Sequence, residues 1–263
     1  MNRTGALTLV LLYVASAPAL GAEAKPYEAA YDVTVNDWKL PCEIVHSTGT
    51  QIVRIEKTCT DWNVASHFEL GAEAGGRNMN FVTTLTATEA INGTSYRFES
   101  NNTLNGQVIA QTAGTATRAV ANGPGKIVLT KPEARTTALP PETLFPLAAF
   151  KWTESQWEKG EKKANYVTFD GTTEDPLRVF ELLTSRVDLP NPPPEGDQLL
   201  LQGKAWRTNG SYFAYGGNEA EALSTLTQNV LANGIATQVT LDIGFANVTL
   251  NLRRVRALPE PKC

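Results

Sequence analysis

The stretch FVTTLTAT, residues 81–88, decides the fold class of this 263-residue chain. Phe81, Leu85 and Ala87 fall on one side of an extended backbone, and Thr84 and Thr86 fall on the other. Period-two alternation of this kind is typical of a half-buried antiparallel strand, and the threonines suit a pleated surface that faces water. The stretch predicts a strand with one apolar face and one wet face.

On both sides of this stretch, the same period of two recurs far more often than the period of 3.6 that marks a helix. Shorter alternating runs lie at 31–35, 53–55, 96–98 and 127–129. Further strands are predicted at 163–169, 177–187, 199–206, 223–231, 235–243 and 247–256. The chain is therefore predicted to be mainly β, with strands that follow one another as an antiparallel meander.

Turn signals punctuate these runs. Asparagine or aspartate followed by glycine tolerates the positive φ of tight hairpins. Such pairs occur at Asn92-Gly93, Asn122-Gly123, Asp170-Gly171, Asn209-Gly210 and Asn233-Gly234. The proline-rich segment 189–196 is predicted to be a stiff exposed loop and not a domain linker, because strand-like sequence resumes at once after it. With no internal repeat and no second core, we expect residues 23–263 to form a single domain.

One segment breaks the β pattern. Residues 146–159 begin with a proline, which a first helical turn tolerates, and Gly160 follows them. Leu147, Phe150, Glu154 and Trp157 fall on one side of the predicted helix. We expect this inserted helix to pack its aromatic residues against the sheet, although aromatic side chains can also serve as a ligand platform.

The N-terminus has the features of an export signal. Arg3 precedes a short apolar stretch at 6–17, and small residues continue to Ala24. The stretch is too short to span a bilayer, so residues 1–22 are predicted to be a cleaved signal peptide. No later stretch has the pattern of a transmembrane segment, and we expect a protein that is exported to an oxidising compartment.

Charge and motifs exclude several function classes. After signal removal, 22 basic residues remain against 27 acidic ones, and this acidic balance does not favour nucleic acid as a partner. Two histidines, His46 and His67, make a zinc site improbable. The segment Gly123-Pro124-Gly125-Lys126 lacks the spacing of a phosphate-binding loop and is read as a hairpin turn. No catalytic, cofactor-binding or metal residues are predicted.

A hydrolase remains a minor alternative. His67 lies in a strand pattern, where a histidine is more often a surface or core residue than a general base. Acidic pairs such as Glu158 with Glu161 and Glu219 with Glu221 have the pattern of solvated surface.

Three cysteines leave an odd one. The possible pairs among Cys42, Cys59 and Cys263 cannot be separated by their spacing alone, and an unpaired cysteine often behaves as a small buried hydrophobe. A disulfide between the terminal cysteine and an early one would close a loop of about 200 residues. In the polymer model, that closure stabilises the fold by about 5 kcal/mol, and it requires an oxidising compartment.

A series of short features runs through the chain in a recognisable order. They are the first strand at 27–33, the segment 49–56, the element Cys59-Thr60-Asp61-Trp62, the stretches 81–88, 93–98, 101–102 and 114–116, the pair 131–132, the helix start at 144–146, the turn at 169–171 and Cys263. In this order they resemble the EipB family of periplasmic cell-envelope integrity proteins, which carry the domain of unknown function 1849. The resemblance covers nearly the whole mature chain.

The resemblance implies a β-spiral, a long antiparallel sheet that curls on itself around an inserted helix, similar in shape to lipoprotein carriers. It also implies a disulfide between Cys59 and Cys263. The chain departs from the family at Asp61, where the family has glycine, and at the additional Cys42. Glycine adopts backbone angles that aspartate adopts less often. The family's backbone conformation at this position therefore does not transfer directly to Asp61.

Three functional hypotheses follow. The leading one is a non-catalytic periplasmic protein that supports envelope integrity by binding an envelope component or a protein partner on its curved sheet. The first alternative is a carrier of lipid or acylated protein, which needs an apolar cavity between sheet and helix. The second is an envelope hydrolase. The sequence names neither the ligand nor the oligomeric state.

Overall fold

The computed structural model describes residues 25–40, 44–187, 194–217 and 221–263. The predicted signal peptide at 1–22, Cys42, Glu219 and most of the proline-rich segment lie outside the described residues. In the described part of the chain, no helix is long and apolar enough to cross a membrane.

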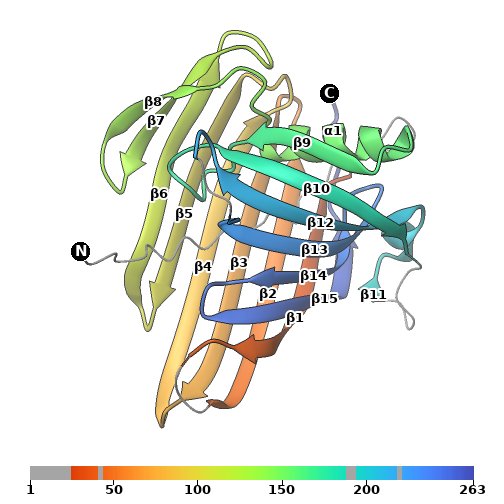
Figure 1. Ribbon diagram of the computed structural model, residues 1–263. Helices are drawn as coiled ribbons and strands as arrows, with labels where there is room; N and C mark the ends of the chain where they lie inside the picture. Colours follow the sequence, from red (N-terminus) through yellow and green to blue (C-terminus); the bar gives the residue numbers. More distant parts are fainter. Residues whose placement is uncertain (1–24, 41–43, 188–193, 218–220) are drawn as a thin grey trace.

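The described elements are strands with one α-helix and one short 3-10 helix (Figure 1). The first half of the chain contains β1 (Tyr27–Trp38), β2 (Ile44–Lys57), β3 (Asp61–Ala74), β4 (Arg77–Ala90), β5 (Ser95–Leu104), β6 (Gln107–Arg118), β7 (Gly125–Lys131) and β8 (Arg135–Leu139). The second half contains α1 (Pro146–Glu158), β9 (Lys163–Thr168), β10 (Leu177–Arg186), β11 (Glu195–Gly196), the 3-10 helix η1 (Gln198–Leu201), β12 (Ala205–Ala214), β13 (Ser224–Leu231), β14 (Ala236–Asp242) and β15 (Ala246–Ala257).

All strands belong to one sheet. Its order is β8-β7-β6-β5-β4-β3-β2-β1-β15-β14-β13-β12-β10-β9, and β11 pairs with β15 beside this path. Strands along the path are antiparallel, so the meander predicted from the sequence is confirmed. The first and last strands meet in the middle of the sheet, and β8 and β9 form its two ends.

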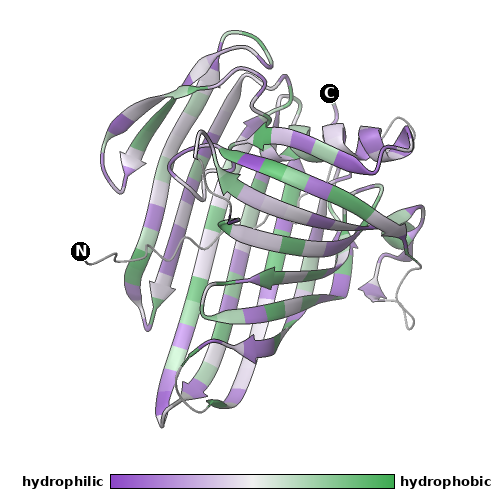
Figure 2. Cartoon of the chain, in the orientation of Figure 1, coloured by the Kyte–Doolittle hydropathy of each residue, from purple (hydrophilic) through white to green (hydrophobic). Residues whose placement is uncertain are grey.

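The sheet curls so that its two halves cover each other. In Figure 1, β10 and β12–β15 cross in front of the long strands β1–β4 at a steep angle. Apolar and polar bands alternate along the strands (Figure 2), and the apolar side chains fill the space between the halves. Phe81 and Leu85 of the stretch at 81–88 are buried, whereas Thr86 is exposed, as the alternation predicted.

Helix α1 begins and ends as its sequence predicts. Pro146 occupies the first turn, and Gly160 after the helix has a φ of 88°. The buried face includes Leu147, Glu154 and Trp157, while Phe150 packs partly buried against the main core. The helix follows β8 and precedes β9, and it lies beside β9 at one end of the molecule (Figure 1).

Two local predictions are wrong. Residues 199–206 do not form one strand: Leu200 and Leu201 are both buried, which a 3-10 turn allows and alternation does not, and β12 begins only at Ala205. Asn209-Gly210 is not a hairpin turn either. It lies inside β12, where the Asn209 side chain donates a hydrogen bond to Thr227 Oγ1 on β13 (3.0 Å).

The positions of Cys59 and Cys263 follow from the place of β1 in the sheet. Tyr27, at the start of β1, pairs with Ile55 of β2 on one side and with Ala257 of β15 on the other. The ends of β2 and β15 therefore lie on either side of the same residue. Beyond these ends, Cys59 and Cys263 have Cα atoms 5.6 Å apart and are joined by a disulfide.

Candidate functional site

The outer face of the first half of the sheet carries a hollow of about 560 Å³. Two rows of paired residues cross six strands there. The first row is Arg54, Ala65, Thr86, Glu99, Ala113 and Lys131. The second row is Glu56, Asn63, Thr88, Arg97, Thr115 and Val128. We call the space over these two rows the outer hollow.

The hollow forms where small side chains of the rows lie between long ones. Ala65 and Thr86 leave space between Arg54 on β2 and Glu99 on β5, and these four residues line the hollow. At the bulge between Ala113 and Gly114, the backbones of β6 and β7 approach each other closely and the sheet bends. A Cβ on Gly114 would lie 2.3 Å from the Val128 carbonyl oxygen.

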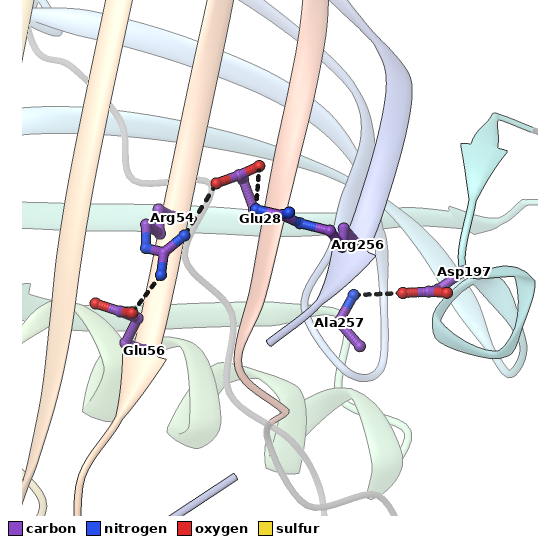
Figure 3. A network of polar contacts seen from close by, with 6 residues as sticks. All are labelled: Glu28, Arg54, Glu56, Asp197, Arg256 and Ala257. Atoms are coloured by element: carbon purple, nitrogen blue, oxygen red, sulfur yellow. Dashed lines mark hydrogen bonds and ion pairs between the residues drawn. The ribbon is translucent and has the colours of Figure 1, made fainter. Parts of the chain in front are cut away.

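The long side chains at the rim are held by ion pairs (Figure 3). Glu28 accepts hydrogen bonds from Arg54 Nη1 (3.1 Å) and from Arg256 Nη2 (3.0 Å), and Arg54 Nη2 also donates to Glu56 (2.5 Å). The side-chain hydrogen bond to Glu56, above all, raises the pKa of Arg54. At the opposite rim, Lys131 Nζ lies 2.8 Å from Glu99. The outer hollow therefore presents fixed charges of both signs.

A second hollow, of about 510 Å³, lies where β5 and β6 face the ends of β10, β12 and β13. Its inner wall includes Ser100, Asn102 and Thr112, and its mouth includes Ile109 and Leu223. We call it the seam cavity, because it lies between the two halves of the sheet.

The loop before β10 forms one wall of the seam cavity and is fixed by hydrogen bonds from the first half. Tyr96 donates its hydroxyl to the Asp170 carbonyl (2.7 Å), and Thr112 donates to the Gly171 carbonyl. Gly171 has a φ of 74°, and a Cβ there would lie 2.3 Å from the Phe98 ring. Glycine is thus required both by the backbone and by the ring beneath it.

Buried acidic groups gather near α1 and not at either hollow. Glu89 of β4 accepts hydrogen bonds from the Leu147 and Ala148 amides (2.9 and 3.0 Å) at the N-terminus of α1. Burial raises the pKa of Glu89 to about 7, although the two amides and nearby Arg118 act in the opposite direction. Burial also raises the pKa of Glu154 to about 7, and neither of its oxygens has a hydrogen-bond partner.

Two further buried carboxyls belong to the second half. Burial raises the pKa of Asp170 and of Glu181, and Tyr166 donates its hydroxyl to Glu181 (3.3 Å). None of these four acids lines the outer hollow or the seam cavity.

The residues considered for hydrolysis do not assemble. His67 is exposed on the outer face, with Nε2 3.9 Å from Glu69. The neighbouring Ser66 points to the opposite face, as strand geometry requires, and accepts a hydrogen bond from Gln51 (3.0 Å). Glu158 pairs with Lys204 (2.7 Å). Over the described ranges, no group of three or more His, Cys, Asp or Glu side chains could hold a metal ion.

The region between helix and sheet is where a lipid carrier would need its cavity. Leu147 belongs to the main core there, and Trp157 packs with Ala164 and Trp206 in a separate cluster. No residue of α1 lines the outer hollow or the seam cavity. Neither hollow therefore corresponds to the space that the carrier hypothesis requires.

Sequence reasoning did not find the residues of the two hollows. Alternation predicted that Thr86 and Glu99 face water, but only the strand register brings them side by side on adjacent strands. Asp61 also behaves differently from the expectation raised by the family: it lies in β3, paired with Ala90, and its φ is not positive.

Comparison with known proteins assigns the chain to a family. The profile of the EipB-like family matches residues 18–259. No curated protein matches the chain. Among solved structures, the chain is similar to a β-barrel-like protein of the domain of unknown function DUF1849 from Brucella abortus, with 17% identity and a TM-score of 0.77. The similarity covers 90% of this chain and 99% of that one, and it shows a shared fold.

Proposed function

The chain belongs to the EipB-like family, and from that premise we propose that it is a non-catalytic protein of the bacterial envelope that binds a partner in the outer hollow. The partner is an envelope component or an envelope protein. Export to the periplasm is supported by the N-terminal sequence and by a disulfide that suits an oxidising compartment.

The observation that carries the proposal is the pair of polar rows over β2–β7. The space above them, about 560 Å³, falls within the range of ligand sites. Arg54 is held by Glu28 and Glu56, so its position is fixed before a partner arrives. A preorganised rim lowers the entropy cost of binding, and its mixed charges suit a polar partner better than an acyl chain.

The test replaces two threonines that occupy the same kind of position. Thr86 lies on the floor of the outer hollow, and Thr225 lies exposed on β13 in the other half of the sheet. A photo-crosslinking residue at position 86 is expected to capture an envelope component in intact cells, whereas one at position 225 is not. Thr86→Arg, which fills the hollow, should abolish rescue of a deletion strain under detergent stress, and Thr225→Arg should retain it.

Two results would contradict the proposal. One is full rescue by Thr86→Arg with a protein level equal to wild type. The other is equal capture by the probes at positions 86 and 225, which would show that the outer hollow has no special affinity. Thermal unfolding of both purified variants is the control for folding.

A further inference from the structure

The lower part of β6 has a free edge. Residues 107–112 pair with β5 on one side, but β7 pairs with β6 only from Ala113 onward. Within the described part of the chain, no strand pairs with the other side of 107–112. Such an edge exposes backbone N–H and C=O groups that can form a ladder with another extended chain.

Two side chains at this edge are apolar and exposed. Val108 is 54% exposed and Ile109 is 44% exposed, and Leu223 is 43% exposed on the far side of the seam cavity. Soluble proteins usually protect a free edge with charged residues, and Val108 and Ile109 do the opposite. The edge and the cavity mouth therefore form one continuous surface with aliphatic contacts on both sides.

The inner wall of the cavity contains an unused hydrogen-bonding group. Asn102 lines the cavity and is 6% exposed, and its Oδ1 has no hydrogen-bond partner among the described residues. A buried acceptor without a donor is unfavourable, and a ligand that brings a donor would satisfy it. This polar wall does not suit an acyl chain, which carries no donor along its length.

The charged residues of the cavity favour a basic ligand. Arg135 is the one cation among the lining residues that the structure describes, and it lies 3.0 Å from Asp175 and 3.4 Å from Glu174. Two carboxylates share one guanidinium, so the lining has a net charge of −1. A basic side chain on a ligand would balance the second carboxylate.

We propose that the β6 edge at 107–112 and the seam cavity bind an extended, basic polypeptide segment of a partner protein as an added strand. Its backbone pairs with the free edge. One side chain with an N–H or O–H donor enters the cavity toward Asn102, and a lysine or arginine lies against Glu174 and Asp175. This site is separate from the outer hollow, and it stands whether or not the outer hollow binds a partner.

The experiment uses the full mature protein and an array of ten-residue synthetic peptides that vary in charge and in aliphatic content. Peptides with alternating aliphatic residues and at least one lysine or arginine are expected to bind. Binding of the best peptide is then measured by fluorescence anisotropy. N-methylation of its alternate amides should weaken binding at least about tenfold, because added-strand pairing needs those N–H groups.

Two matched variants locate the site on the protein. Val108 and Val120 are both exposed valines, and Val120 lies in the turn between β6 and β7, outside the cavity lining. Val108→Lys should weaken peptide binding at least about tenfold by adding a charge to the edge, and Val120→Lys should change it by less than about twofold. Asp175→Asn should selectively weaken the basic peptides.

The proposal is overturned by any of three outcomes. The array yields no binding peptide, the best peptide binds the Val108→Lys variant as tightly as wild type, or a fluorescent fatty acid displaces the peptide from the cavity. The last outcome would assign the cavity to a lipid. Because none of these measurements involves Thr86, failure here is distinguishable from failure of the outer hollow.

Discussion

The two halves of the sheet meet at two places that are built in different ways. In the middle of the sheet, β1 and β15 pair along most of their length, and the disulfide between Cys59 and Cys263 closes the end of this junction. Near the ends of the sheet, the segment between β8 and α1 is joined to the end of β9 by a short backbone contact and by buried side chains. The backbone link described there is the bridge between Leu144 and Thr168.

The side-chain junction is built around aromatic rings and one buried cation. Phe145 stacks on Tyr96 with centroids 5.3 Å apart, and Arg118 lies 4.6 Å above the Phe145 ring. Arg118 also donates to the carbonyls of Gly93 and Thr143 (both 2.7 Å). Backbone pairing tolerates many side chains, whereas this junction depends on a few particular ones. The difference teaches that backbone pairing and one covalent bond hold the middle junction, whereas noncovalent packing of a few particular side chains holds the end junction.

The largest single effect is expected from the covalent part of the middle junction. Cys59→Ser should lower the free energy of unfolding by about 5 kcal/mol in the polymer model, because the loop closed by the disulfide spans 204 residues. Urea denaturation at fixed pH measures the loss. Cys42→Ser serves as the control, since it leaves both sulfurs of the disulfide in place, and equal stability of the two variants would refute the structural role.

Nearly as large an effect is expected from the end junction. Phe145→Ala should destabilise the protein by about 4 kcal/mol, because a fully buried ring is lost and its cavity cannot collapse between Tyr96 and Arg118. Phe213→Ala is the matched control: Phe213 is half-buried and also lies beneath an arginine, Arg178, at 5.3 Å. A similar loss in both variants would show that the junction has no special sensitivity.

The carboxyl at the end junction should make stability depend on pH. The folded pKa of Glu89 is about 7 against an ordinary value of 4.5, so the folded state binds more protons between these values. The stability that Glu89 contributes to the folded state is fully present below pH 4.5 and is lost as the pH rises to 7. This loss lowers the free energy of unfolding by about 3 kcal/mol. Glu89→Gln should flatten this part of a stability profile measured by urea denaturation. An unchanged slope in the variant would contradict the assignment.

The smallest effect is expected from the ion pairs beside the middle junction. Glu28→Gln removes the charge that pairs with both Arg54 and Arg256, and these side chains are partly exposed to solvent. Surface pairs of this kind contribute less than about 1 kcal/mol, and salt screens them. The difference from wild type should shrink further at high salt. A loss as large as that of Phe145→Ala would mean that backbone pairing alone does not hold the middle junction.

Much of the fold could be predicted because its signals are local. The alternation at 81–88, the turns at Asn92-Gly93 and Asn233-Gly234, and the helix after Pro146 all appear in the structure at the expected places. Asn209-Gly210 shows the limit of such signals. Its turn propensity is real, but pairing with β10 and β13 on both sides keeps it extended within β12.

The candidate sites could not be predicted in the same way. The outer hollow depends on the register between neighbouring strands, that is, on which residue of one strand pairs with which residue of the next. The sequence of a single strand does not specify this register. Asn102 and Ile109 lie on neighbouring strands beside a register irregularity, and their importance comes from β7 leaving β6 after Ala113. Glu89 lies 58 residues before Leu147, whose backbone amide donates a hydrogen bond to it.

By itself, the sequence determined most of the strands and their turns, the α-helix and the family resemblance, because hydrophobic period and turn chemistry act over a few residues. Only the tertiary structure decided the rest. It placed the first and last strands side by side, left 107–112 without a strand partner on one side among the described residues, and buried Glu89 against the N-terminus of α1. These features require contacts between residues far apart in the chain, and such contacts form only when the sheet curls and its two halves exclude water together.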